Sequence, residues 1–315
     1  HAMACTSCTS ALHLATMALD LGPGDEVIIP AFAYISVIEV ICLLGAKPVL
    51  VDVNFDTFQI DENEIKLAIT SKTKAIIPVH LFGQCGNLEA ILSIAKAHKI
   101  FVIEDNAQAL GAKYQHHFLG TLGDIGCTSF FPTKNLACFG DGGALFTNDD
   151  LLAEKIRAIA NHGQKEKYNH VILGLNSRLD TLQASILSIK LKHIDKNLIK
   201  RREIATQYLN ALKNIKDIGL PESDANCVAS WNQFTIKIKN DKRDALRQYL
   251  KEHGIETMIY YPKVLNQQKA YTNFDNSYKN SIVLSLEVLS LPIHQLLKED
   301  DVLSITKHIK TFFKL

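Results

Sequence analysis

A single lysine, Lys134, follows the apolar segment Ile125-Gly126-Cys127-Thr128-Ser129-Phe130-Phe131 and precedes the glycine-rich turn Gly140-Asp141-Gly142-Gly143. Hardly any other charged residue lies in this stretch, so a buried ammonium there has no sequence neighbour to pair with. Burial lowers the pKa of such an ammonium toward that of a free amine, which is the group that Schiff-base chemistry needs. The alternative is a loop lysine whose ammonium reaches water, and other motifs must decide between the two.

Two other places in the sequence could bind a ligand. Small hydroxyl residues, Thr6-Ser7-Cys8-Thr9-Ser10, precede an amphipathic helix over residues 11–19. Free backbone N–H groups at such a helix start can bind a phosphate, although an ordinary N-cap cluster has the same composition. Asp105 ends a buried strand, and ligands of parallel α/β sheets gather at the carboxyl ends of the strands.

The composition is that of an ordinary soluble protein. The chain has 315 residues, of which 47% are hydrophobic and 21% charged, and its net charge is +1. This near-neutral balance argues against sequence-independent binding of nucleic acid. No apolar run approaches the ~20 residues that span a bilayer, so we expect no membrane partner.

Seven cysteines are scattered along the chain. We expect reduced thiols in the cytoplasm that serve as small core residues. Cys5-Thr6-Ser7-Cys8 has the CxxC spacing of a redox pair or of half a zinc site. No second CxxC or CxxH follows at metal-ligand spacing, so the prediction is that no metal is bound.

Strands that are apolar on both faces alternate with helices over the first half of the chain. This pattern predicts an α/β fold with a parallel sheet covered by helices on both sides. No strand is followed by G-x-G-x-x-G, so the dinucleotide-binding fingerprint is absent. A long helical pattern from about residue 176 to 212 predicts a bridge between a large domain, 1–195, and a small α+β domain, 196–315. Within the latter, residues 231–238 alternate as a half-exposed strand does.

Six motifs occur in an order that is more specific than any one of them. They are Thr9-Ser10-Ala11-Leu12, Pro23-Gly24-Asp25-Glu26-Val27, Glu104-Asp105-Asn106-Ala107-Gln108-Ala109, Ser129-Phe130-Phe131-Pro132-Thr133-Lys134, Asn176-Ser177-Arg178-Leu179-Asp180 and Leu289-Ser290-Leu291-Pro292-Ile293-His294. Over nearly the whole chain, they resemble the DegT/DnrJ/StrS family of sugar aminotransferases. The resemblance implies pyridoxal 5′-phosphate (PLP) on a fold-type-I scaffold, with a mostly parallel seven-stranded sheet and a smaller C-terminal α+β domain.

The resemblance also implies roles for residues around the cofactor ring. Lys134 forms the Schiff base and then carries a proton between cofactor and substrate, while Asp105 holds the pyridine nitrogen protonated. Gln108 contacts the 3′-oxygen, and Tyr34 stacks on the ring. Taken alone, Asp105 would be a helix cap and Tyr34 a core residue. Some members carry histidine at the lysine position and act as dehydratases, so Lys134 favours transamination.

By the same resemblance, the cofactor phosphate is held by the backbone of Cys8 and Thr9, the hydroxyl of Ser129, and Asn176 of a neighbouring subunit. The last contact implies a homodimer with shared active sites.

The expected reaction is the amination of a nucleotide-linked keto-sugar with glutamate as donor. His162-Gly163-Gln164 and the lysine motif resemble the branch that aminates C3 of UDP- or dTDP-linked sugars for surface polysaccharides, including the O-antigen of lipopolysaccharide. A C4-aminating enzyme is the alternative. Two other functions are less compatible with the sequence. A non-catalytic regulator on this scaffold is expected to lack Lys134 or Asp105, and both are present. A sugar oxidoreductase that uses NAD is expected to carry the G-x-G-x-x-G fingerprint, which is absent.

Some positions depart from the family pattern. Cys8 stands where glycine is common, and Ala33 replaces a frequent threonine. The stretch Tyr260-Tyr261-Pro262-Lys263-Val264-Leu265-Asn266 differs from the usual His-Tyr-Pro-x-Pro-Leu-His, which makes the sugar specificity the weakest inference. The family's N-terminal segment, which contributes a helix and part of the substrate pocket, has no counterpart in residues 1–315. We expect the natural protein to carry it.

Overall fold

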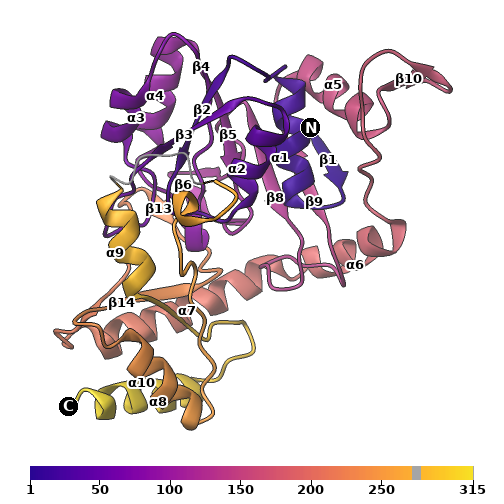
Figure 1. Ribbon diagram of the computed structural model, residues 1–315. Helices are drawn as coiled ribbons and strands as arrows, with labels where there is room; N and C mark the ends of the chain where they lie inside the picture. The colour runs from indigo at the N-terminus through magenta and orange to yellow at the C-terminus, as the bar shows by residue number, and fades with distance from the viewer. Residues whose placement is uncertain (272–277, 315) are drawn as a thin grey trace.

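A seven-stranded sheet forms the centre of the first half of the chain in the computed structural model, which describes residues 1–271 and 278–314 (Figure 1). The strand order is β1-β9-β8-β5-β4-β2-β3. The strands are β1 (Ala2–Cys5), β9 (Gly143–Phe146), β8 (Ile125–Ser129), β5 (Phe101–Asp105), β4 (Thr73–Ile76), β2 (Glu26–Pro30) and β3 (Lys47–Val51). Only β9 is antiparallel to its neighbours, β1 and β8. The prediction of a mostly parallel seven-stranded sheet is confirmed.

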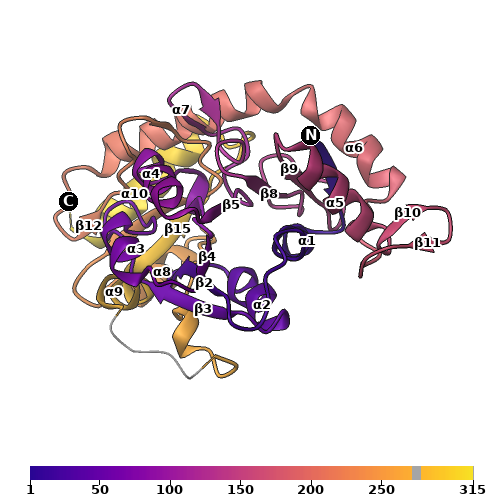
Figure 2. The same ribbon diagram turned by 90° about the horizontal axis from the view of Figure 1, so that it is seen from above.

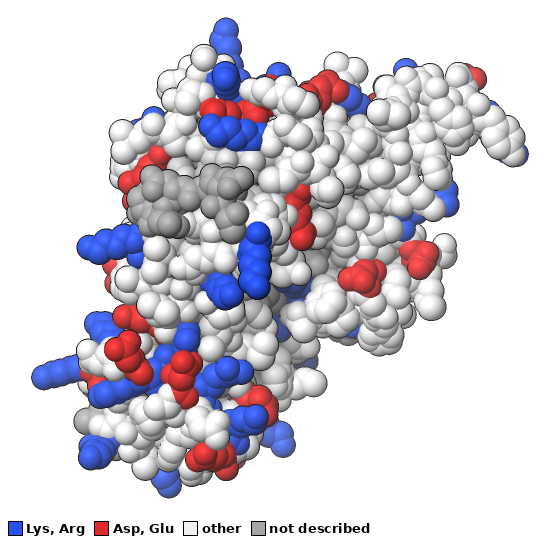
Figure 3. All heavy atoms as spheres, viewed as in Figure 1, with Lys and Arg blue, Asp and Glu red and all other residues white. Residues whose placement is uncertain are grey.

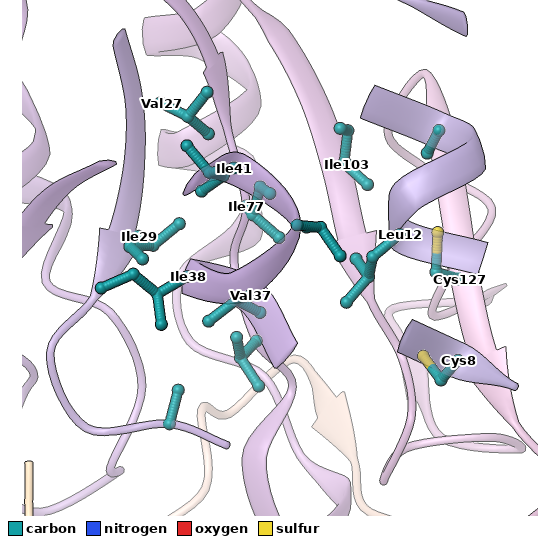
Figure 4. Close-up of a cluster of buried hydrophobic side chains, with 14 of the residues drawn as sticks. Cys8, Leu12, Val27, Ile29, Val37, Ile38, Ile41, Ile77, Ile103 and Cys127 are labelled. Carbon is teal, nitrogen blue, oxygen red and sulfur yellow. The ribbon is translucent and has the colours of Figure 1, made fainter. Parts of the chain in front are cut away.

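Helices cover both faces of this sheet, as Figure 2 shows. They are α1 (Cys8–Ala18), α2 (Ser36–Leu43) and α5 (Asp150–Ala160) on one face and α3 (Glu62–Ala68) and α4 (Leu88–His98) on the other. Val27 and Ile29 of β2 point into the first core cluster and Ile28 into the second, as the two-residue period of a strand requires. Figure 4 shows the first cluster, in which Ile38 and Ile41 of α2 lie against these strands.

The last third of the chain forms a smaller α+β unit at the bottom of Figure 1. Its elements are α7 (Ile194–Leu212), β12 (Ile218–Gly219), β14 (Phe234–Ile238), α8 (Arg243–Glu252), α9 (Lys279–Glu287), β15 (Val288–Leu291) and α10 (Glu299–Phe312). A separate cluster of buried side chains, which includes Tyr208, Phe234 and Ile309, forms its core. The division at residue 195, one residue after α7 begins, stays a prediction.

Two expectations about secondary structure are wrong. The long helical pattern forms two helices, α6 (Thr181–Leu191) and α7, because the His193 N–H bonds Lys190 O and the four-residue ladder is interrupted there. Strand β14 is buried on both faces rather than half-exposed. Its Lys237 is 2% exposed because its ammonium reaches Asp56 of the large unit, at 2.8 Å.

Short strands complete the structure. They are β6 (Lys113–Tyr114), β7 (His117–Phe118) and β13 (Cys227–Val228), which form one sheet, and the hairpin of β10 (Gln164–Glu166) and β11 (Asn169–His170), which extends from the body in Figure 1. Among the residues that the structure describes, no helix combines the length and the apolar character that a membrane span requires.

Candidate active site

A cavity of about 340 Å³ opens at the carboxyl ends of the central strands, and we call it the main cavity. Seven of the eight predicted site residues line it: Cys8, Thr9, Tyr34, Asp105, Gln108, Ser129 and Lys134. They come from four separate segments of the chain. The parallel strands bring them together because all of these strands end at the same edge of the sheet.

Lys134 reaches this cavity from a turn that follows β8. Its backbone N–H donates to Phe131 O at 2.9 Å. Its ammonium makes no hydrogen bond or ion pair of defined geometry with any residue in the described part of the chain. Burial lowers the pKa of Lys134, although the negative charge of Asp105 acts in the opposite direction. The side chain is therefore a less basic amine than an ordinary lysine, and it lines the main cavity.

Asp105 is the last residue of β5 and is only 4% exposed. Its Oδ1 accepts hydrogen bonds from the Ala107 N–H at 3.0 Å and from the Cys8 thiol at 3.7 Å. Within residues 1–271 and 278–314, no group donates to Oδ2. Burial raises the pKa of Asp105, and the Ala107 N–H and the Lys134 charge partly offset this effect. One carboxylate oxygen thus remains free for a cationic ligand group.

Glu104 fixes the end of β5, and its side chain points to the face of the sheet opposite that of Asp105. Glu104 accepts hydrogen bonds from His80 Nε2 at 2.8 Å and from three backbone N–H groups. These N–H groups belong to Gly120, Leu122 and Gly123. Burial alone would raise the pKa of Glu104, but these contacts outweigh it and the pKa is lowered. The result is a rigid support for the end of β5.

The start of α1 presents free donors to the cavity. Ser7 caps the helix by accepting from the Ser10 N–H, at 3.1 Å. No described residue accepts from the N–H groups of Cys8 or Thr9. Strand β9 passes so close that a Cβ on Gly143 would lie 2.4 Å from the Ser7 carbonyl carbon. Only glycine fits there, which explains one residue of the glycine-rich turn.

Aromatic side chains and Gln108 form another wall. Gln108 Oε1 accepts from the Phe82 N–H at 2.7 Å, and its Nε2 donates to Tyr261 Oη at 2.9 Å. Tyr34 is 54% exposed and its ring centroid lies 5.9 Å from that of Tyr261. Tyr34 is therefore not a core residue, and one of its faces is available to a flat ligand.

Sequence reasoning missed other residues that line this cavity, including Ser36 and Gln233. Ser36 lies 2.6 Å from Thr9 through their hydroxyl oxygens, and Gln233 comes from the small unit. A lone serine or glutamine carries no signal of its own in a sequence. Only the packing of the small unit against the sheet brings Gln233 to the cavity.

Asn176 does not line the main cavity of its own chain. It is exposed and pairs with Asn161 in an isolated antiparallel bridge. The next residue, Ser177, is buried and lies 3.2 Å from the Thr6 hydroxyl. Asn176 is thus an exposed residue that makes no wall of the main cavity in its own chain.

The two cysteines of the CxxC segment point in different directions. The Cys5 thiol donates to Ser7 O at 3.2 Å, whereas the Cys8 thiol faces Asp105. Burial raises the pKa of Cys5 to about 12 and also raises that of Cys8. In the part of the chain that is described, no group of three or more His, Cys, Asp or Glu residues could hold a metal ion.

These features coincide with those of a known family. The sequence profile of the DegT/DnrJ/EryC1/StrS aminotransferase family matches residues 1–310. The chain belongs to this family. The resemblance inferred from the six motifs is thus confirmed, together with the fold class.

Individual members of the DegT/DnrJ/EryC1/StrS family match at high identity. A "pleiotropic regulatory protein" of Geobacillus stearothermophilus is 44% identical over the whole chain and 85% of its own length. A "UDP-2-acetamido-2-deoxy-3-oxo-D-glucuronate aminotransferase" of Pseudomonas aeruginosa is 44% identical over 93% of the chain and 81% of its own length. The solved structure of DesV from S. venezuelae, in complex with a ketimine intermediate, superimposes with a TM-score of 0.97 at 37% identity. It covers all of the chain and 85% of DesV.

The family's enzymes are PLP-dependent aminotransferases, and solved relatives hold PLP or its amino form. The main cavity fits this cofactor. It offers an amine, a carboxylate oxygen for a protonated pyridine nitrogen, and N–H groups for a phosphate, none of which has a partner in the described part of the chain. When bound, PLP receives the amino group and serves as an electron sink.

Proposed function

We propose that this aminotransferase acts on a nucleotide-linked keto-sugar and replaces the keto oxygen at C3 with an amine taken from glutamate. The observation that carries the proposal is that Lys134 and Asp105 line one cavity, and that neither the Lys134 amine nor Oδ2 of Asp105 has a hydrogen-bond partner among the described residues. The relative named as a 3-oxo-D-glucuronate aminotransferase supports amination at C3. Following the resemblance, we assign the reaction to the cytoplasm and to the synthesis of surface polysaccharides such as O-antigen.

Lys134 and Asp105 have complementary roles in this proposal. Lys134 holds the cofactor through Nζ and, once released, moves a proton at the reacting carbon. Its lowered pKa suits both tasks, because a neutral amine is the nucleophile and the base. Asp105 keeps the pyridine nitrogen protonated through Oδ2. Both residues are present, which argues against a purely regulatory role of the kind that one relative's name suggests.

The start of α1 and Ser129 hold the cofactor phosphate in our proposal. The N–H groups of Cys8 and Thr9 have no acceptor among the described residues and lie at the positive end of the helix. The Ser129 hydroxyl accepts from the Phe131 N–H at 3.2 Å, so its own proton is available to a phosphate oxygen. Gln108 and Tyr34 complete the cofactor contacts, at the 3′-oxygen and the ring face.

Asn176 of the partner subunit supplies the remaining phosphate contact in a homodimer with shared sites. Large apolar side chains near Asn176 are exposed in the single chain, among them Leu173 at 88% and Leu182 at 71%. Figure 3 shows charged side chains concentrated over the small unit and sparse over the upper right of the same face. Exposed leucine side chains such as these favour association with a second copy.

Mixed dimers test the shared site. A subunit with Asn176→Ala is combined with a subunit with Lys134→Ala, so that one site carries both lesions and the other neither. We expect up to half of wild-type activity per dimer. Mixed dimers no more active than the Asn176→Ala homodimer would show that Asn176 serves its own chain.

The position of amination is tested by running the reaction backward. The PLP form is mixed with UDP- and dTDP-linked 3-amino and 4-amino sugars, and the loss of visible absorbance is followed. We expect the 3-amino sugars to convert the cofactor faster. Faster conversion by the 4-amino sugars would make the C4-aminating alternative correct, and conversion by neither would refute the assignment to nucleotide sugars.

A further inference from the structure

Two cysteines that are distant in the sequence, Cys85 and Cys227, meet where the chain of the small unit crosses the large unit. Cys85 lies just after the short 3₁₀ helix η1 (Leu81–Gly83), and Cys227 is the first residue of β13. The Cys85 N–H donates to the Cys227 sulfur at 3.4 Å, across 142 positions of sequence. Both residues are free thiols, and no role described above involves either of them.

Cys227 belongs to a segment that leaves the small unit after β12, crosses the large unit and returns as β14. We call residues 222–230 the strap. Within the strap, β13 pairs with β6 of the large unit, as Figure 1 shows. The N–H of the first strap residue donates to Asp56 O at 3.1 Å, and that of the last donates to Gly83 O at 2.8 Å. The strap is therefore attached to the large unit on both sides of Cys227.

The loop beneath the strap, residues 81–85, also supports the main cavity. Its Phe82 N–H donates to Gln108 Oε1, and this contact orients the Gln108 amide toward the cavity. Gln84 of the same loop is fully buried and accepts from the Ser223 hydroxyl of the strap at 2.5 Å. A covalent bond between the two cysteines thus joins the strap to the loop that positions Gln108.

The two thiols differ in exposure and in acidity. Cys85 is 1% exposed, whereas Cys227 is half-buried and can meet a small reagent. The Cys85 thiol donates a hydrogen bond to the Cys227 sulfur, which lowers the pKa of Cys227 although burial acts in the opposite direction. The same hydrogen bond, together with burial, raises the pKa of Cys85. Because the thiolate is the nucleophile, Cys227 should react first.

We propose that Cys85 and Cys227 form a reversible disulfide, with a small-molecule disulfide such as oxidised glutathione as oxidant, and that this bond fastens the strap to the large unit. The Cys227 thiolate attacks one sulfur of the oxidant and releases one glutathione thiolate, which leaves a mixed disulfide on Cys227. The Cys85 thiol then loses its proton, attacks the Cys227 sulfur and releases the second glutathione thiolate. Two electrons pass from the protein thiols to the oxidant, and excess reduced glutathione reverses both steps.

Spatial position rather than sequence spacing selects this pair. The Cys227 sulfur lies 3.4 Å from the Cys85 nitrogen, which is within reach of the short Cys85 side chain, as a disulfide requires. Cys5 and Cys8 have the CxxC spacing, but both are buried and their thiols donate to different acceptors. We therefore expect oxidation to link Cys85 to Cys227 and to leave the CxxC segment reduced.

Mass spectrometry tests where the link forms. PLP-loaded protein is incubated with oxidised glutathione at about pH 8, near the ordinary pKa of a thiol, and the remaining thiols are alkylated before digestion without reductant. We expect one cross-linked peptide pair that joins Cys85 to Cys227, with a mass two hydrogens below that of the separate peptides. In Cys85→Ala the second step is missing, so glutathione should stay bound to Cys227.

Thermal unfolding tests what the link does to the structure. A disulfide that spans 142 positions restricts the unfolded chain, so oxidised wild type should have a Tm roughly 5 °C or more above that of the reduced protein. Dithiothreitol should abolish the difference. Cys42→Ser, which removes an exposed thiol of α2, is the matched control and should form the link and gain the same Tm. Cys227→Ser should do neither.

Three results would overturn the proposal. Wild type that keeps glutathione on Cys227 without forming the link would show that Cys85 does not reach it. An unmodified Cys227, or a cross-link between other cysteines in place of this one, would show that the pair is not the reactive one. A link that forms without raising the Tm would show that it does not fasten the strap.

Discussion

Replacing Asp105 by asparagine changes one atom at the point where the cofactor ring is expected. Oδ1 is held by the Ala107 N–H at 3.0 Å, so the asparagine oxygen should keep that place. The new NH2 group then takes the position of Oδ2, the oxygen with no donor among the described residues. A donor thus replaces the acceptor that a protonated pyridine nitrogen requires.

The size of the effect follows from the burial of the carboxylate. Asp105 is 4% exposed, so water screens its charge weakly. Two unit charges about 3 Å apart at an effective dielectric constant of about 20 attract by roughly 5 kcal/mol. Since each 1.36 kcal/mol is tenfold in rate, we expect the half-reaction with glutamate to slow by about 10³- to 10⁴-fold.

The assay is a single-turnover measurement of the visible absorbance of the PLP-loaded protein after mixing with glutamate. PLP should remain bound, because the phosphate contacts at Cys8 and Thr9 are untouched. Asp20→Asn, an exposed carboxylate paired with Lys155, is the control and should react at the wild-type rate. A rate for Asp105→Asn within tenfold of wild type would show that another group holds the ring nitrogen.

Further predictions concern Glu104, Lys134 and Lys237. Glu104→Gln should lower the free energy of unfolding by about 3 kcal/mol at pH 7 in urea titrations. In the folded protein the pKa of Glu104 is lowered, so its contribution to stability is complete above the ordinary value of 4.5 and is lost as pH falls through the folded pKa. The difference in unfolding free energy between Glu104→Gln and wild type should therefore shrink at low pH, and a constant difference would contradict the prediction. Because burial lowers the pKa of Lys134, the rate of PLP uptake by cofactor-free protein should rise with pH around a midpoint below 10.5, and a midpoint at or above that value would refute it. Lys237→Met removes the ion pair with Asp56 and should lower the free energy of unfolding by about 1.5–3 kcal/mol. A decrease of less than about 0.5 kcal/mol would mean that the pair contributes little to stability.

The sheet and most of the candidate site follow from local sequence patterns. Short runs such as residues 26–30 and 125–129 have the length and composition of strands buried on both faces, and the structure has such strands there. Once these are parallel, Asp105 and Ser129 must end at one edge, and Lys134 follows directly. The backbone conformation around each of these residues is determined by residues close to it in the sequence. Their placement at the edge of the sheet can therefore be predicted from local sequence patterns.

The rest depends on contacts between distant residues. Lys237 alternates with apolar neighbours as an exposed residue would, but its partner Asp56 lies 181 positions away. Gln233 lines the main cavity only because the small unit packs against the large one. The proposed partner contact of Asn176 involves a second copy, which the pattern of one chain describes only through resemblance.

The most direct test of the account locates the residue that bears the cofactor. PLP-loaded protein is reduced with borohydride, digested, and searched by mass spectrometry for the peptide that carries the phosphopyridoxyl group. We expect the group on the Nζ of Lys134 and no labelling of the Lys134→Ala variant. Labelling of a different lysine in wild type, or the same peptide pattern in Lys134→Ala, would contradict the central claim.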